Sequence, residues 1–137
     1  MDLSVKLSEI ENEPEEAAQK SFPYREAVGC LNYIATISRP DISFTVNALA
    51  RQSNNPTEQH WRAVKKVMRY LKGTLNFSLV YKGNDQGQFH GYSDSDYAGD
   101  LSERKSTSGY VFVFQDGPIA WSSILQRITA LSSSEAE

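Results

Sequence analysis

Three acidic residues close together in the second half of the chain could bind metal ions. Asp94 ends a segment, residues 89–94, whose alternating pattern predicts a strand, and Asp96 and Asp100 follow it. Side chains two positions apart share one face of a strand, so Asp96 can continue the face that carries Asp94. Hydrolysis of a phosphodiester by two metal ions needs several carboxylates that converge on two hard cations about 4 Å apart. On residue types alone, turn formation explains these acids equally well, because Asp is common in turns.

Two further acids, Glu135 and Glu137, lie in the last three positions of the sequence. Glu135 comes three residues after Ser132, the spacing of a capping box that opens a helix, so its side chain has a capping role available. Glu137 lies two positions further, about 200° around a helix, and points elsewhere. If one of the two faces Asp94, we therefore favour Glu137. Both are also explained as solvated acids at the start of a helix, where they interact favourably with its dipole.

A second kind of chemistry, contact with phosphates, is suggested by basic residues. They recur at helical spacing beside an apolar stripe: Arg62, Lys65, Lys66, Arg69 and Lys72. This spacing lets a helix pack with one flank and meet a nucleic-acid backbone with the other, although a charged helix face is by default simply solvated. Arg104 and Lys105 form a second candidate phosphate contact, with the hydroxyl groups of residues 106–108 as further donors. Without a base-reading motif, such binding would be independent of nucleotide sequence and sensitive to salt.

Three helices are predicted before the acidic segment. The first begins near Pro23 and carries apolar residues at helical spacing, and Gly29 within it suggests close packing, because glycine costs about 1 kcal/mol relative to alanine. The second restarts after a cap-like Ser38. The third is opened by Asn55 as N-cap, with the following proline at the first helical position, and is ended by Gly73.

In the rest of the chain, short runs of alternating apolar and polar residues predict a mostly antiparallel sheet. Strands are expected at residues 77–81, 89–94, 110–114, around 119–121 and at 128–131. The predicted fold class is therefore α+β, with three helices before a sheet that lacks the helices to cover it. The predicted parts are an acidic flexible leader, a helical segment and a sheet domain: residues 1–20, 21–76 and 77–137.

Composition and charge restrict the classes of protein to which this chain could belong. The 137 residues carry a net charge of −3, and six acids and two bases in residues 1–20 account for −4 of it, leaving +1 for the remainder. The acidic leader thus sets the low pI, which is no evidence against a nucleic-acid partner. Cys30 is the only cysteine, which excludes an internal disulfide and a multi-cysteine zinc site, and we expect it to be buried. No apolar run is long enough to span a membrane and no secretory signal is visible, so an intracellular location is expected.

Several short segments together resemble copia-type LTR retrotransposon Pol polyproteins, in the region that joins the end of reverse transcriptase to ribonuclease H. They follow the order of that family over residues 20–137, and the combination is specific although no single string would be. The segments are residues 24–29, 39–42, 69–74, 91–100, 104–111 and 131–137.

The resemblance implies a truncated ribonuclease H-like domain that begins near Phe89, preceded by helices similar to the polymerase thumb or connection. It implies a Mg²⁺-dependent endonuclease that removes RNA from RNA:DNA hybrids, with Asp94 as the first metal ligand and Glu137 as the second. The later Asp ligands of the family would lie downstream of this chain, and the paired-Asp motif of the polymerase would lie upstream. We therefore expect a Pol fragment that is inactive alone.

The partners that the resemblance implies are an RNA:DNA hybrid or another nucleic acid and the remainder of Pol, with no membrane. The expected location is the cytoplasm, in a virus-like particle, or the nucleus. Two alternatives remain at this point. One is a non-catalytic nucleic-acid-binding module, and the other is a structural relic whose exposed sheet face drives self-association.

Overall fold

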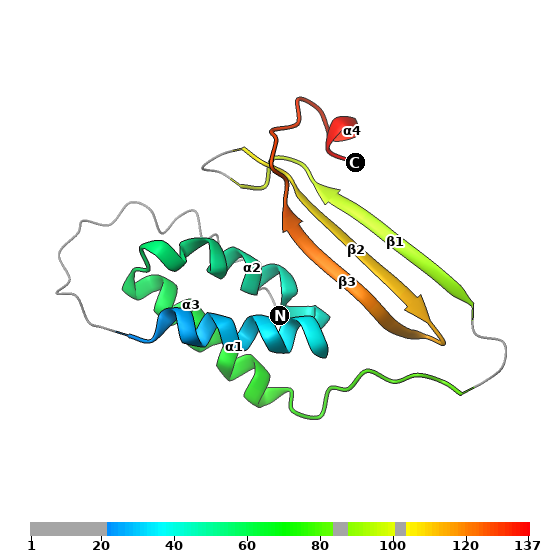
Figure 1. Cartoon of the computed structure of the whole chain (residues 1–137), viewed down its shortest axis with the longest axis horizontal. Helices are drawn as coiled ribbons and strands as arrows, with labels where there is room; N and C mark the ends of the chain where they lie inside the picture. Colours follow the sequence, from blue (N-terminus) through cyan, green and yellow to red (C-terminus); the bar gives the residue numbers. More distant parts are fainter. Residues whose placement is uncertain (1–21, 84–87, 101–103) are drawn as a thin grey trace.

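The structure, a computed structural model, describes residues 22–83, 88–100 and 104–137 (Figure 1). Its elements are α1 (Tyr24–Ile37), the 3₁₀ turn η2 (Pro40–Ile42), α2 (Ser43–Arg51), the 3₁₀ turn η3 (Gln52–Asn54), α3 (Glu58–Gly73), β1 (Phe89–Asp96), β2 (Thr107–Phe114), β3 (Gly117–Leu125) and α4 (Ser133–Ala136). Helices followed by an antiparallel sheet confirm the predicted α+β class. The predicted acidic leader, residues 1–20, lies outside the described residues.

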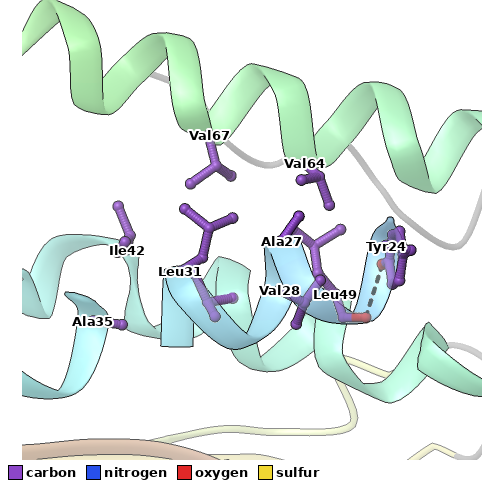
Figure 2. Close-up of a cluster of buried hydrophobic side chains, with 10 residues drawn as sticks. Tyr24, Ala27, Val28, Leu31, Ala35, Ile42, Leu49, Val64 and Val67 are labelled. Atoms are coloured by element: carbon purple, nitrogen blue, oxygen red, sulfur yellow. Dashed lines mark hydrogen bonds between the residues drawn. The ribbon is translucent and has the colours of Figure 1, made fainter. Parts of the chain in front are cut away.

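The three long helices enclose one apolar core (Figure 2). Each contributes residues three or four positions apart, so that one stripe of every helix is buried. The buried side chains are Tyr24, Ala27, Val28, Leu31 and Ala35 of α1, Ile42 of η2, Val46 and Leu49 of α2, and Val64 and Val67 of α3. The phenol of Tyr24 donates a hydrogen bond of 2.9 Å to the carbonyl of Leu49, which fixes the start of α1 against α2.

Burial raises the pKa of Tyr24 to about 12. Because this value lies above that of an unfolded tyrosine, near 10, the contribution of Tyr24 to stability is complete below pH 10 and is lost as the pH rises towards 12. We expect Tyr24→Phe to be about 1 kcal/mol less stable than the wild type at pH 8, where a buried hydrogen bond is lost. The difference should shrink above pH 10, as measured by urea unfolding at several pH values. A difference that stays constant up to pH 11.5 would contradict this account.

Gly29 and Cys30 lie on the exposed side of α1, and both predictions about them were wrong. A Cβ atom at Gly29 would have no neighbour within 4 Å, so this glycine serves no close packing. Cys30 is exposed and has a free thiol. The buried stripe of α1 passes through Val28 and Leu31, and the two positions between them face away from α2 and α3.

We expect Gly29→Ala to stabilise the chain by about 0.5–1 kcal/mol. Alanine restricts the unfolded chain and favours the helix, and nothing in the structure obstructs its methyl group. The midpoint of urea unfolding should rise with an unchanged slope. Gly117→Ala is the matched opposite case, because a Cβ there would lie 2.5 Å from the ring of Tyr81, and it should destabilise.

The ends of the predicted helices differ from the structure in two places. Thr57, and not Asn55, is the N-cap of α3: its Oγ1 accepts from the amide of His60 at 3.4 Å, and its own amide donates to Nδ1 of His60 at 3.0 Å. A histidine at the third position replaces the Glu or Gln of the usual capping box, so the signal was missed. Ser38 is the C-cap of α1, where its amide donates to the carbonyl of Ile34, and its side chain does not cap η2. Gly73 is the last residue of α3, as predicted.

Arg39 joins the end of α1 to the end of α3. Its buried guanidinium forms two hydrogen bonds with Asp41, of 2.9 Å from Nε and 2.7 Å from Nη2, and donates to the hydroxyl of Thr74 at 2.7 Å. It also lies over the rings of Tyr70 and Phe77, 5.4 and 5.7 Å from their centres. The hydroxyl of Tyr70 donates to Asp41 Oδ2 at 2.8 Å. The guanidinium beside Asp41 holds the pKa of that carboxyl below its usual value.

The sheet has the order β1-β2-β3, with both pairs antiparallel. Gln115 and Asp116 connect β2 to β3 and both have left-handed backbone angles, with φ of 51° and 62°, as a tight two-residue hairpin turn requires. Two predicted strands are absent from the described residues. Residues 77–81 form no strand and meet the end of the hairpin, where the hydroxyl of Tyr81 donates to the carbonyl of Pro118 at 2.7 Å and the amide of the following Lys82 donates to the carbonyl of Gln115 at 3.0 Å. Residues 128–131 instead turn the chain into α4.

The two faces of the sheet have different surroundings. The helices lie beside β3, with β1 farthest from them (Figure 1), and Trp121 Nε1 donates to the carbonyl of Ala35 at 2.7 Å. Strand pairing places Trp121 on the same face as Val111 and Tyr92. The opposite face, here called the outer face, carries Phe89, Gly91, Ser93 and Ser95 of β1, Ser108, Tyr110, Phe112 and Phe114 of β2, and Ala120, Ser122 and Ile124 of β3.

Candidate functional site

Asp94 lies near the end of β1, on the helix-facing side of the sheet. It pairs with Gly109 of β2, and two positions on, Asp96 pairs with Thr107. Both carboxylates are exposed and share one face, because β1 continues regularly through Asp96. The Oδ1 atom of Asp94 accepts a hydrogen bond of 2.9 Å from the amide of Ser95. The predicted shared face is thus present, and Asp94 is held by a strand rather than by a loose turn.

The last helix confirms the capping role of Glu135. The hydroxyl of Ser132 accepts from the amide of Glu135 at 3.2 Å, and Oε2 of Glu135 accepts from the amide of Leu131 at 2.8 Å. Glu137 follows the helix and is exposed, with its carboxylate uncommitted to capping. Its role as a metal ligand remains a prediction.

Gln126 anchors α4 to the sheet. Its Nε2 atom donates to Ser108 Oγ at 2.7 Å and to the carbonyl of Ala136 at 2.6 Å. Ser108 belongs to the outer face, whereas Asp94 belongs to the helix-facing side. The anchoring of α4 therefore does not by itself bring Glu137 onto the face that carries Asp94.

The acidic residues do not by themselves fit a pair of metal ions. Within residues 22–83, 88–100 and 104–137, no three His, Cys, Asp or Glu side chains gather closely enough to hold one cation. Mg²⁺ requires near-octahedral coordination, and a two-ion centre requires several carboxylates. Among the described residues, Asp94 is held on a regular strand, but no cluster of ligands forms around it.

The predicted basic residues do lie on one flank of α3, which we call the basic flank: Arg62, Lys65, Lys66, Arg69 and Lys72. Four of these side chains are exposed and that of Lys66 is half-buried, while Val64 and Val67 on the opposite flank are buried in the core. Arg62 forms an exposed salt bridge of 3.0 Å with Glu58. Among the described residues, Lys65, Lys66 and Lys72 form no salt bridge. The Thr57 cap and the buried stripe hold this flank in a fixed orientation.

The second candidate phosphate contact is smaller than predicted. Arg104 is exposed, with a left-handed φ of 54°, and the carbonyl of Lys105 accepts from the amide of Asp100 at 3.1 Å. Ser106 was wrongly predicted as a phosphate donor, because it is completely buried and its hydroxyl accepts from the amide of Ala98 at 3.1 Å. The hydroxyl of Ser108 is likewise engaged within the protein.

Sequence reasoning missed the cluster around Arg39. Beside it lies an open cavity of about 440 Å³, lined in part by Asp41, Asn76, Phe77 and Leu79. The only signal was the string Arg-Pro-Asp, which does not reveal that Tyr70 and Thr74 complete the cluster from α3. Asp41 and Thr74 accept hydrogen bonds from Nε, Nη1 and Nη2 of Arg39, so the cluster joins the ends of the helices.

Comparisons with known proteins find Pol polyproteins of transposons and a short secreted protein. The chain is similar to a retrovirus-related Pol polyprotein from transposon TNT 1-94 of Nicotiana tabacum, with 45% identity over 123 residues, which are 90% of this chain and 9% of that protein. It is 45% identical over 114 residues to the Pol polyprotein from transposon RE1 of Arabidopsis thaliana, covering 83% of this chain and 8% of that protein. It is 42% identical over 118 residues to the secreted RxLR effector protein 161 of Plasmopara viticola, covering 86% of this chain and 83% of that protein.

No family model and no solved structure matches the chain. None of the helices within the described ranges is long and apolar enough to cross a membrane. The chain spans less than a tenth of the length of the Pol polyproteins it matches, but most of the length of the short Plasmopara protein. The chain is thus similar to one segment of retrovirus-related Pol polyproteins from transposons.

Proposed function

We propose that this segment belongs to the ribonuclease H region of Pol and binds the backbone of an RNA:DNA hybrid through the basic flank of α3. The observation that carries the proposal is the arrangement of five cationic residues on one flank of a helix whose other flank is fixed in the core. A rigid cationic surface attracts phosphates without reading bases.

The dimensions and charges of the basic flank support this function. From Arg62 to Lys72 the helix advances about 15 Å, at about 1.5 Å for each residue, which is enough to follow several phosphates of one strand. Lys65, Lys66 and Lys72, which form no salt bridge within the described ranges, can release counterions when they contact phosphates. Arg104 adds an exposed cation in the connection that follows Asp94.

We further propose that Asp94 provides one ligand of a Mg²⁺ centre and Glu137 a second, with the remaining carboxylates supplied by other parts of Pol. Support for Asp94 comes from its exposed carboxylate on a regular strand, beside Asp96. Bound metal ions would activate water and stabilise the charge that develops on the phosphate. Because the described residues do not complete such a centre, we expect this chain alone to bind hybrids and not to cleave them.

The experiment is a titration of a fluorescein-labelled RNA:DNA hybrid followed by fluorescence anisotropy at several salt concentrations. Three or four phosphate contacts predict a plot of log Kobs against log salt with a slope of roughly −3 to −4, and a Kd of about 1–100 μM at physiological salt. The matched variant Asp94→Asn should bind equally well or slightly better, because it removes a negative charge. Absence of binding at 50 mM salt, or affinity that does not respond to salt, would refute the proposal.

A further inference from the structure

The open cavity of about 440 Å³ lies beside the ends of α1 and α3, between residues 38–41 and 76–79, where the chain leaves α3 towards the sheet (Figure 1). Its volume is in the usual range of small-molecule pockets, about 300–1,000 Å³. Arg39 holds the two ends together, because its guanidinium donates both to Asp41 and to the hydroxyl of Thr74, at 2.7 Å in each case. The cavity is therefore framed by fixed contacts within the protein.

The lining of the cavity is polar but carries no net charge. Its charged residues, Arg39 and Asp41, form an ion pair of 2.7 Å. Among the described residues, the side chains of Ser38, Asn76 and Ser78 form no hydrogen bond, so their donors and acceptors are available to a ligand. A phosphate in the cavity would meet the like charge of Asp41, which repels it. An uncharged ligand with hydrogen-bonding edges fits this lining better.

Phe77 gives the cavity an aromatic wall. The guanidinium of Arg39 lies over its ring, 5.7 Å from the centre, while the residue remains 62% exposed. Pro40 and Leu79 add apolar surface to the lining. Nucleobases are flat, uncharged rings with polar edges, and they stack on aromatic side chains of this kind.

The cavity lies at the end of the basic flank of α3. Lys72, the last cation of that flank, comes four positions before Asn76, so their Cα atoms lie within about 14 Å of each other. Lys72 is exposed and forms no salt bridge in the part of the chain that the structure describes. A phosphate held by Lys72 outside the cavity can thus belong to the same strand as a base inside it.

We propose that this cavity binds the base of one unpaired nucleotide, at the point where a nucleic-acid strand leaves the basic flank. The base stacks on Phe77 and bonds through its polar edge to Asn76, while Lys72 neutralises a neighbouring phosphate. This binding mode rests on the proposed function, because the basic flank delivers the strand, and it adds a substrate class: hybrids with a single-stranded tail. Since every base has a flat face, the cavity should accept all four.

Fluorescence anisotropy with two labelled hybrids tests the proposal: a blunt hybrid, and the same hybrid with five unpaired thymidine nucleotides at either end of its DNA strand. Such a tail extends at least about 17 Å, enough to reach from Lys72 to the cavity. At equal salt concentration the tailed hybrid should bind about tenfold more tightly, the gain expected for one stacked base. A tail of abasic nucleotides keeps the phosphates and should lose this gain. An equal gain from the abasic tail would overturn the proposal.

Variants of Phe77 test which residue receives the base. Phe77→Ala should abolish the preference for the tailed hybrid, whereas Phe77→Trp should retain it. Leu75→Ala is the matched control, because Leu75 is 79% exposed in the same connection and lies outside the lining of the cavity. Circular dichroism verifies the fold of each variant. A preference that survives Phe77→Ala would contradict the proposed site.

Photocrosslinking locates the base without any variant. A tail that carries 5-iodouracil should attach mainly to Phe77 on irradiation, as identified by mass spectrometry. Crosslinks to aromatic residues of the sheet, such as Tyr92 or Tyr110, would overturn the proposal and leave the basic flank unaffected. If the blunt hybrid does not bind at 50 mM salt, the proposed function fails by itself. The cavity is then tested with the free iodouracil strand, and failure of that strand to crosslink to Phe77 would refute the cavity as well.

Discussion

Asp41→Ala is expected to lower the free energy of unfolding by about 2–4 kcal/mol, the largest loss of stability that we predict for a single polar residue. The substitution leaves the buried guanidinium of Arg39 without its carboxylate, and it also removes the acceptor of the Tyr70 hydroxyl. Breaking a buried ion pair from one side typically costs about 3–5 kcal/mol, and the partial exposure of Asp41 reduces that figure. Urea unfolding followed by circular dichroism measures the loss.

Two further variants test whether the buried charge of Arg39 causes the loss of stability in Asp41→Ala. Lys82→Ala breaks an equally short ion pair, 2.7 Å between Lys82 Nζ and Asp116 Oδ2, but both partners are exposed, so no measurable change is expected. The double variant Arg39→Met with Asp41→Ala removes both charges and should recover part of the loss. Equal losses for Asp41→Ala and Lys82→Ala would show that burial of Arg39 is not the cause.

The same cluster predicts a dependence on pH. The pKa of Asp41 is lower in the folded chain than in the unfolded chain. The charged Asp41 carboxylate therefore contributes its full stabilisation at pH values above its unfolded pKa, near 4. This contribution is lost as the pH falls through the pKa that Asp41 has in the folded chain. In Asp41→Asn this part of the acid dependence should be absent, so the difference in stability between wild type and variant should narrow on acidification.

The second large effect concerns hybrid binding. Reversing two charges of the basic flank, Lys65→Glu with Arg69→Glu, should weaken hybrid binding by about a hundredfold at 50 mM salt. Two phosphate contacts are lost and two repulsive charges take their place. Both side chains are exposed, and the new acids lie three positions from Arg62 and Lys72, so the stability of α3 should change little. Anisotropy titration gives the affinity, and circular dichroism verifies the fold.

A matched control tests whether position matters or only total charge. Arg51→Glu with Lys82→Glu produces the same change in net charge on exposed residues outside α3. We expect it to weaken binding several-fold at most. If both double variants lose affinity equally, hybrids are attracted by overall charge and the basic flank has no special role.

The sequence predicted the helices better than the strands because helical periodicity is a local signal. The alternation of apolar and polar residues identified β1 and β2, because these two strands pair with each other along their whole length. The apolar run at residues 77–81 carries the same alternation but lies beside only the end of a hairpin, which no local pattern reveals. The N-cap at Thr57 was missed because its partner is His60 rather than an acid.

The sequence predicted some groups of residues in the candidate site better than others. The basic flank could be read directly, because a helical period places its residues together once α3 is recognised. Whether Glu137 approaches Asp94 depends on how α4 is anchored, through a hydrogen bond from Gln126 to Ser108, and no spacing encodes that contact. Arg39 and Tyr70 are 31 positions apart in the sequence, and only the packing of the helices brings them together.

The most direct test of the central claim is a chemical-shift map of the ¹⁵N-labelled chain titrated with an unlabelled RNA:DNA hybrid. The account predicts that the largest changes fall on residues 62–72 of α3 and near Arg104, and that they shrink as salt is added. Changes confined to the outer face of the sheet, or a spectrum unaltered at saturating hybrid, would contradict it.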